Sequence, residues 1–123
     1  MGLRSSALAM GLLVIGSLSA CSRNEAPQPL AADQVPQVVE NAFKEAAPEA
    51  KTSATEVVNS LQGKDDVKAF FELQNLSSRS DLTPVQREAA TRSMLSVNER
   101  LRSAAAQGDQ RAADALQLYR SSK

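Results

Sequence analysis

The chain of 123 residues places apolar side chains at every third or fourth position through most of its length after residue 33. That spacing is typical of α-helices that bury one face. No useful stretch alternates apolar and polar residues as a strand does, and helix-favouring Ala, Leu, Gln, Glu and Arg are plentiful. The pattern predicts an all-α domain, a small bundle of about five short helices. Their expected ranges are residues 33–47, 48–62, 65–76, 83–107 and 109–119.

Local signals mark the ends of these helices. Thr83 can accept a hydrogen bond from a first-turn N–H, and Gln86 can bond back to the N–H of Thr83, which together form a capping box. Pro84 fits the first helical position because its φ is already helical, and Pro48 can either end the first helix or open the second. Three further residues fit caps: Gly63 at a helix C-terminus, and Asp65 and Asp109 at helix N-termini.

The longest predicted helix carries a heptad-like seam of about two heptads. This length favours packing within a small antiparallel bundle over a coiled-coil dimer, which usually needs three or more heptads. The seam residues are Ala90, Met94, Val97, Leu101 and Ala104. The expected core members are Phe43, Leu61, Phe70, Phe71, Leu73, Leu101, Leu116 and Tyr119.

The first 21 residues follow a different pattern. Arg4 precedes an apolar segment, residues 7–18, which suits a signal peptide and is shorter than the roughly 20 residues of a membrane span. The following stretch, Leu18-Ser19-Ala20-Cys21, contains the only cysteine and resembles the lipobox of bacterial lipoproteins. The resemblance implies that residues 1–20 are a signal peptide, that cleavage falls between Ala20 and Cys21, and that Cys21 becomes lipidated.

The expected organisation of the remaining chain follows from that resemblance and from composition. Residues 21–32 form the lipidated cysteine and a flexible tether, and residues 33–123 form the helical domain. Ser22, where some lipoproteins carry Asp, favours the outer membrane, facing the periplasm, within the bacterial cell envelope. Two alternatives stay open: an N-myristoylation pattern over Met1–Ser6, and an ordinary signal peptide that leaves Cys21 as a free thiol.

Composition narrows the candidate chemistry. The chain has 14 basic and 14 acidic residues and no histidine. Removal of residues 1–20 takes away only Arg4, which leaves 13 basic against 14 acidic residues, so no basic excess is present to bind nucleic acid. With Cys21 committed to lipid, the usual general base, nucleophilic thiol and imidazole metal ligand are missing. We therefore expect no catalysis, no cofactor and no metal.

Two weaker resemblances concern the helical domain. Residues 63–73 resemble residues 108–118, each reading as a glycine turn, an acidic cap and an amphipathic helix, as in helical hairpins of tetratricopeptide type. The C-terminal Lys123, which follows Tyr119-Arg120 and two serines, is similar to the end of the murein lipoprotein family, which is attached to peptidoglycan through a terminal lysine.

These observations favour a non-enzymatic, membrane-anchored envelope lipoprotein that binds another protein or supports an assembly. Leu95 and Leu118 lie off the main apolar seams, so they are the candidate interaction surface, although both could simply widen the core. The alternative function is a structural tether between membrane and peptidoglycan through Lys123. The expected partners are the membrane, through the lipid, and a protein.

Overall fold

A computed structural model describes residues 26–123, and in this range the chain is helical and contains no strand. Residues 1–25, with the lipobox-like stretch and Cys21, lie outside the described part. A short 3-10 turn at Ala32–Gln34 leads into the bundle. The helices that follow are α1 (Val35–Ala42), α2 (Pro48–Gln62), α3 (Asp66–Ser77), α4 (Pro84–Ala106) and α5 (Gln110–Ser121). The predicted all-α bundle of about five helices is confirmed.

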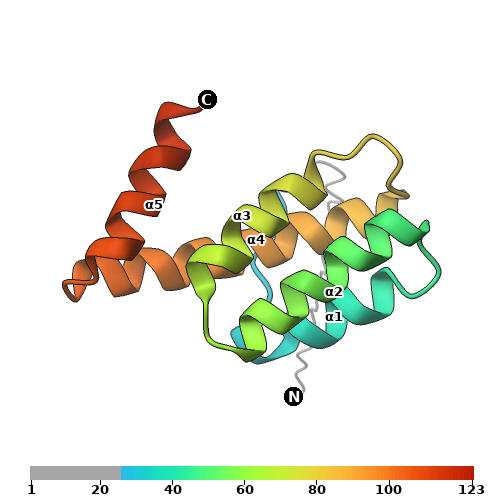
Figure 1. The fold of residues 1–123 in the computed structure, drawn as a ribbon, viewed down its shortest axis with the longest axis horizontal. Coiled ribbons are helices and arrows are strands. Elements are labelled where there is room, and N and C mark those ends of the chain that lie inside the picture. Colours follow the sequence, from blue (N-terminus) through green and yellow to red (C-terminus); the bar gives the residue numbers. More distant parts are fainter. Residues whose placement is uncertain (1–25) are drawn as a thin grey trace, which may run out of the picture.

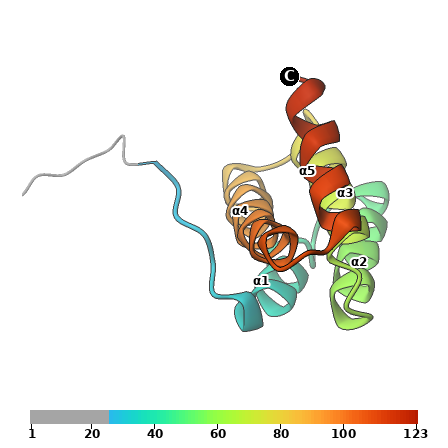
Figure 2. The same ribbon diagram turned by 90° about the vertical axis from the view of Figure 1, so that its left-hand side faces the viewer.

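The first four helices form a closed ring in which each packs against its neighbours in sequence and α1 also packs against α4 (Figure 1). At 1.5 Å per residue, the 23-residue α4 is about 35 Å long, nearly three times the length of the eight-residue α1. The C-terminal part of α4 therefore extends beyond the ring. There α5 packs on it at a steep angle and also touches α3 (Figures 1 and 2).

The core is built from small and medium apolar side chains with few aromatics. Six of the eight expected core residues are buried, and Phe71 and Tyr119 are partly buried against the cluster. In the α4 seam, Ala90, Val97 and Leu101 are buried, as expected for packing inside a bundle. Ser93 also lies in this core with no exposed surface, and its hydroxyl has no hydrogen-bond partner among the described residues.

The first helix is shorter than the sequence pattern predicts. It was expected over residues 33–47, but α1 ends at Ala42 and turns follow as far as Ala46. Ala47 then has an extended ψ of 150°, which is the conformation that a following proline imposes. Pro48 occupies the first turn of α2. Of the two roles open to Pro48, the structure therefore shows that it opens the second helix.

The corner between α2 and α3 is a Schellman motif that passes directly into an N-cap. The N–H of Asp65 donates to the carbonyl of Ser60 at 2.9 Å, and the N–H of Lys64 donates to the carbonyl of Leu61 at 3.1 Å. The Asp65 carboxylate then accepts from the N–H of Lys68 at 3.1 Å and caps α3. The left-handed residue of the motif is Lys64, with a φ of 60°. Gly63, which occupies the C-cap as expected, has an ordinary φ of −82°.

The corner between α4 and α5 repeats this arrangement. The N–H groups of Asp109 and Gly108 donate to the carbonyls of Ala104 and Ala105, each at 3.0 Å. The Asp109 carboxylate accepts from the N–H of Ala112 at 3.1 Å and caps α5. Here the left-handed position is held by Gly108, with a φ of 103°.

The two corners therefore correspond residue by residue at a spacing of 44, because Lys64 matches Gly108 and Asp65 matches Asp109. The sequence comparison of residues 63–73 with 108–118 implies a spacing of 45, because it aligns Gly63 with Gly108. Gly63 is not the left-handed residue of its corner. The physical reason for the difference is that the Schellman motif is defined by its left-handed residue. After α2 that residue is Lys64 and not a glycine.

Candidate functional site

The residues proposed from sequence as functional fall in different parts of the molecule. Ala20 and Cys21 lie outside the described residues. Leu118, on α5, is 60% exposed, while Leu95, on α4, is partly buried. Lys123 is exposed and its Nζ lies 4.6 Å from the centre of the Tyr119 ring, a cation–π distance. The structure does not assemble these residues into one site.

Helix α5 is held on α3 and α4 by its inner face. The Tyr119 ring meets the buried Phe70 ring edge-on, with centroids 5.1 Å apart. Arg111 forms an ion pair with Asp65, the N-cap of α3, at 3.3 Å. With these contacts on the inner side, Leu118 is turned outward. It is one of two large apolar residues that are exposed in the range 26–123.

The chain before the first helix is bound to the bundle. The carbonyl of Gln28 accepts a hydrogen bond from Nε of Arg92 at 2.8 Å, and the N–H of Leu30 donates to the Arg92 carbonyl at 3.4 Å. The Leu30 side chain is only 9% exposed and joins the core. Both residues fall in the range expected from sequence to be a flexible tether, so the free part of that segment is shorter than composition suggests.

A groove of about 370 Å³ opens where this segment, α1 and α4 meet. Its walls are apolar, and Val85 on its edge is the other exposed large apolar residue, at 68%. Three polar residues also line it, and two of them, Arg92 and Glu88, lie 3.9 Å apart. The apolar lining residues are Leu30, Val38, Ala42, Val85 and Ala89, and the polar ones are Asn41, Glu88 and Arg92.

Two other hollows are more polar. One of about 480 Å³ between α1 and α2 is bordered by Glu40, Lys44 and Lys51. The other lies between α2 and α3, where the hydroxyl of Ser60 donates to the Glu72 carboxylate at 2.6 Å. In both hollows polar and charged side chains outnumber the apolar ones, whereas five of the eight residues that line the α1–α4 groove are apolar. This groove is therefore the candidate binding site for an apolar ligand.

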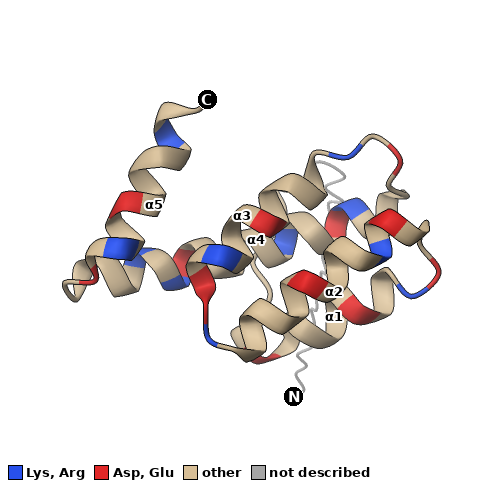
Figure 3. Ribbon diagram, in the orientation of Figure 1, with Lys and Arg blue, Asp and Glu red and all other residues tan. Residues whose placement is uncertain are grey.

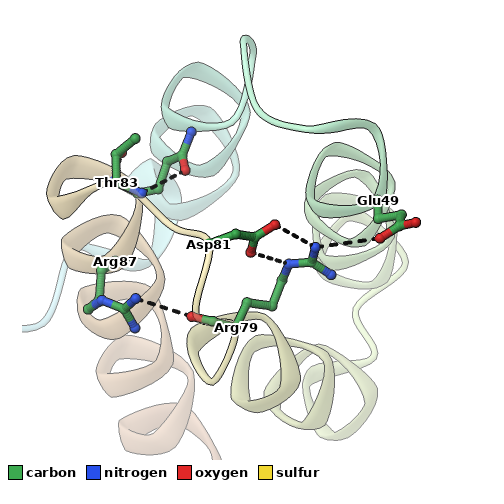
Figure 4. A network of polar contacts seen from close by, with 6 residues as sticks. Glu49, Arg79, Asp81, Thr83 and Arg87 are labelled. Atoms are coloured by element: carbon green, nitrogen blue, oxygen red, sulfur yellow. Dashed lines mark hydrogen bonds and ion pairs between the residues drawn. The ribbon is translucent and has the colours of Figure 1, made fainter.

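The loop between α3 and α4 carries a network of polar contacts (Figure 4). Arg79 donates to both carboxylate oxygens of Asp81, at 2.8 and 2.9 Å, and lies 3.7 Å from Glu49 on α2. Arg87 donates to the carbonyl of Arg79 at 3.1 Å. Hydrogen bonds from Arg79 lower the pKa of the Asp81 carboxyl, and Asp81 correspondingly raises the pKa of Arg79. Since Asp81, Glu49 and Arg87 each contact Arg79, the network fixes the loop.

The predicted capping box at the start of α4 is confirmed. Gln86 N–H donates to Thr83 Oγ1, and Thr83 N–H donates to Gln86 Oε1, both at 3.1 Å. A second link, from α4 to α3, is the two-bond pair of Arg100 with Asp66, the shorter bond being 2.6 Å. These contacts hold α4 to the α3–α4 loop and to α3.

Neither charge nor metal chemistry singles out a further site in the described range. Basic and acidic residues are interspersed along the helices (Figure 3). Across residues 26–123 there is no cluster of three or more His, Cys, Asp and Glu side chains that could bind a metal ion. Within the same range, no helix combines the length and the apolar character needed to cross a membrane.

The sequence alone did not indicate the groove or the bound segment before it. Leu30 lies in a proline-containing segment with no periodic apolar pattern, and Val85 lies between Pro84 and Gln86 in the capping box, so neither residue marks a groove in the sequence. Comparisons of the chain with protein-family models, with curated proteins and with solved structures give no match. The function of this chain must therefore be inferred from its own residues.

Proposed function

We propose that this protein is a lipid-anchored, non-enzymatic interaction module of the bacterial cell envelope. The observation that carries the proposal is the stretch Leu18-Ser19-Ala20-Cys21 behind a 12-residue apolar segment. Acylation at Cys21 would hold the domain at a membrane, most simply the outer membrane on its periplasmic side. Several acyl chains anchor firmly because each buried methylene contributes about 0.8 kcal/mol.

Binding by a helical face is the role that the domain supports best. Leu118 is exposed on a helix that stands off the four-helix ring, while the same helix is fixed in place by Tyr119 and Arg111. A rigid helix that presents an apolar side chain is suited to contact another protein, because little conformational freedom is lost on binding. Leu95 is the weaker candidate since it is already partly buried.

Intact-mass analysis of the protein from a bacterial envelope fraction tests the anchor. We expect cleavage before Cys21 together with added acyl mass, and we expect Cys21→Ser to remove both. A product that is cut elsewhere and keeps a free thiol would contradict the lipoprotein assignment.

Leu118→Ser tests the interaction surface, with Val85→Ser as a matched control that removes the other exposed apolar residue. We expect only Leu118→Ser to weaken crosslinking of the anchored protein to its neighbours, while both variants keep the wild-type melting temperature. A third variant, Lys123→Arg, keeps the charge and the cation–π contact but alters the side chain through which peptidoglycan would be attached. Loss of cell-wall association in this variant alone would favour the structural tether instead.

A further inference from the structure

We propose that the groove between α1 and α4 binds an acyl chain attached to Cys21 of the same molecule. This inference rests on the proposed lipidation, and it assigns a site in the helical domain to part of the lipid. The groove is apolar along its walls, about 370 Å³ in volume, and bordered by Val85, which is 68% exposed.

The position of the groove relative to the chain argues for this occupant. Leu30 contributes to the groove wall and is buried in the core. Cys21 lies nine residues before it, and an extended chain of that length spans at most about 30 Å. Because the segment is bound to Arg92 through Gln28 and Leu30, any group on Cys21 stays within about 30 Å of the groove wall.

Confinement raises the effective concentration of the acyl chain at the groove. A short linker converts binding into an intramolecular event at millimolar effective concentration. A weak apolar site, which would scarcely bind a free fatty acid, can then be substantially occupied. When the lipid is inserted in a bilayer, its acyl chain leaves the groove. When the protein is outside the bilayer, the groove covers one acyl chain.

The lining of the groove also suits an alkyl chain, because five of its eight residues are apolar. The polar residues Asn41, Glu88 and Arg92 stand among its lining residues, so the polar end of an attached lipid can stay hydrated while the hydrocarbon is buried. Withdrawal of hydrocarbon from water supplies the driving force in proportion to the apolar area covered.

The single cysteine makes a direct test feasible. The mature chain, residues 21–123, is alkylated at Cys21 with N-hexadecylmaleimide or, as the reference, with N-ethylmaleimide. In both reactions the thiolate adds across the maleimide double bond and the neighbouring carbon takes up a proton, so that only the alkyl length differs. We expect the hexadecyl adduct to melt higher by about 4 °C or more, the shift that a modest stabilisation produces in a domain of this size.

Matched variants test whether the groove causes the difference in melting temperature between the two adducts. Val85→Glu places a charge on the groove edge, and Leu118→Glu places the same charge on the other exposed apolar residue, away from the groove. Because both side chains are exposed, both variants should fold. The shift in melting temperature should fall by at least half in Val85→Glu and persist in Leu118→Glu. Amide NMR shifts between the two adducts should concentrate at Val38, Asn41 and Ala89, which line the groove.

Three results would overturn the inference: equal melting temperatures of the two adducts, amide shifts concentrated away from the groove, or loss of the effect in Leu118→Glu alone. Sedimentation adds a fourth, because a hexadecyl adduct that dimerises where the ethyl adduct is monomeric places the chain on a second copy. The test is independent of the cell's processing enzymes. An unlipidated Cys21 in the envelope fraction would therefore contradict the proposed function and leave this measurement valid.

Discussion

Replacing Gly108 with alanine should destabilise the domain through backbone conformation alone. Gly108 has a φ of 103°, which is beyond the left-handed region that residues with a side chain occasionally adopt. A Cβ added at this position would meet no atom within 4 Å. Any loss of stability in Gly108→Ala must therefore come from the backbone and not from a steric clash with the rest of the fold.

The size of the effect follows from two opposing contributions. A residue with a side chain loses about 1–2 kcal/mol in the left-handed conformation. Alanine also restricts the unfolded chain more than glycine does, which returns about 0.4–1 kcal/mol. The net expectation is a decrease of about 1 kcal/mol in the free energy of unfolding. At the equivalent position, Lys64 has a φ of 60°, inside the left-handed region, so Lys64→Gly should gain a smaller amount, about 0.5 kcal/mol.

Urea denaturation followed by circular dichroism, on a chain of residues 26–123, measures these differences. Gly63→Ala is the matched control, since Gly63 lies in the α2–α3 corner with a φ of −82° and has room for a Cβ 3.4 Å from the nearest atom. We expect its free energy of unfolding to be unchanged or slightly higher. If Gly63→Ala were as destabilising as Gly108→Ala, or if Lys64→Gly lowered stability, the explanation by positive φ would be refuted.

Three further expectations concern single side chains. Thr83→Ala removes the acceptor of the α4 capping box and should lower the free energy of unfolding by about 1 kcal/mol in urea denaturation. Ser93→Ala removes a buried hydroxyl without a hydrogen-bond partner and favours the helix, so the same measurement should show a gain of about 0.5–1 kcal/mol. The pKa of Asp81 is lowered from 3.8 by Arg79, so this pair stabilises fully above pH 3.8 and its contribution is lost as the pH falls through the lower folded value. Stability measured from about pH 5 down to about pH 2 should therefore fall less steeply in Asp81→Asn than in the wild type.

Each of these expectations has an outcome that contradicts it. An unchanged denaturation midpoint in Thr83→Ala would mean that α4 does not depend on its cap. A loss of stability in Ser93→Ala would mean that the hydroxyl has a partner or fills space that alanine leaves empty. An identical acid dependence in Asp81→Asn and the wild type would show that the Arg79 pair does not couple to folding.

The caps were predictable from sequence because they depend on residues three or four positions apart. The box of Thr83 with Gln86 and the N-caps Asp65 and Asp109 rest on local hydrogen bonds, whereas the sequence left two roles open for Pro48. Apolar stripes also predicted four of the five helical ranges closely, but α1 ends at Ala42 and not at residue 47.

The groove was not predictable because its walls come from distant parts of the chain. Leu30, Val38 and Val85 are brought together only when the ring closes through the contact of α1 with α4. The left-handed lysine escaped prediction for a related reason. A capping glycine is the usual marker of a Schellman motif, and Lys64 adopts the left-handed conformation without that marker.

The two exposed apolar residues lie on different helices and are suited to different partners. Val85 belongs to the first turn of α4, beside the groove and the segment that leads to Cys21. Leu118 lies on α5, which begins only after the far end of that helix, about 35 Å away. An anchor at Cys21 would draw the Val85 end towards the lipid, since the chain is bound to Arg92 on the same face. The α5 end, with the C-terminus, lies on another side of the bundle from the segment before α1, which leaves on the side of α4 (Figure 2), so Leu118 would stay accessible to a protein. On this view one helix separates the lipid-facing function from the protein-facing function, and Val85→Glu and Leu118→Ser should each impair only one of them.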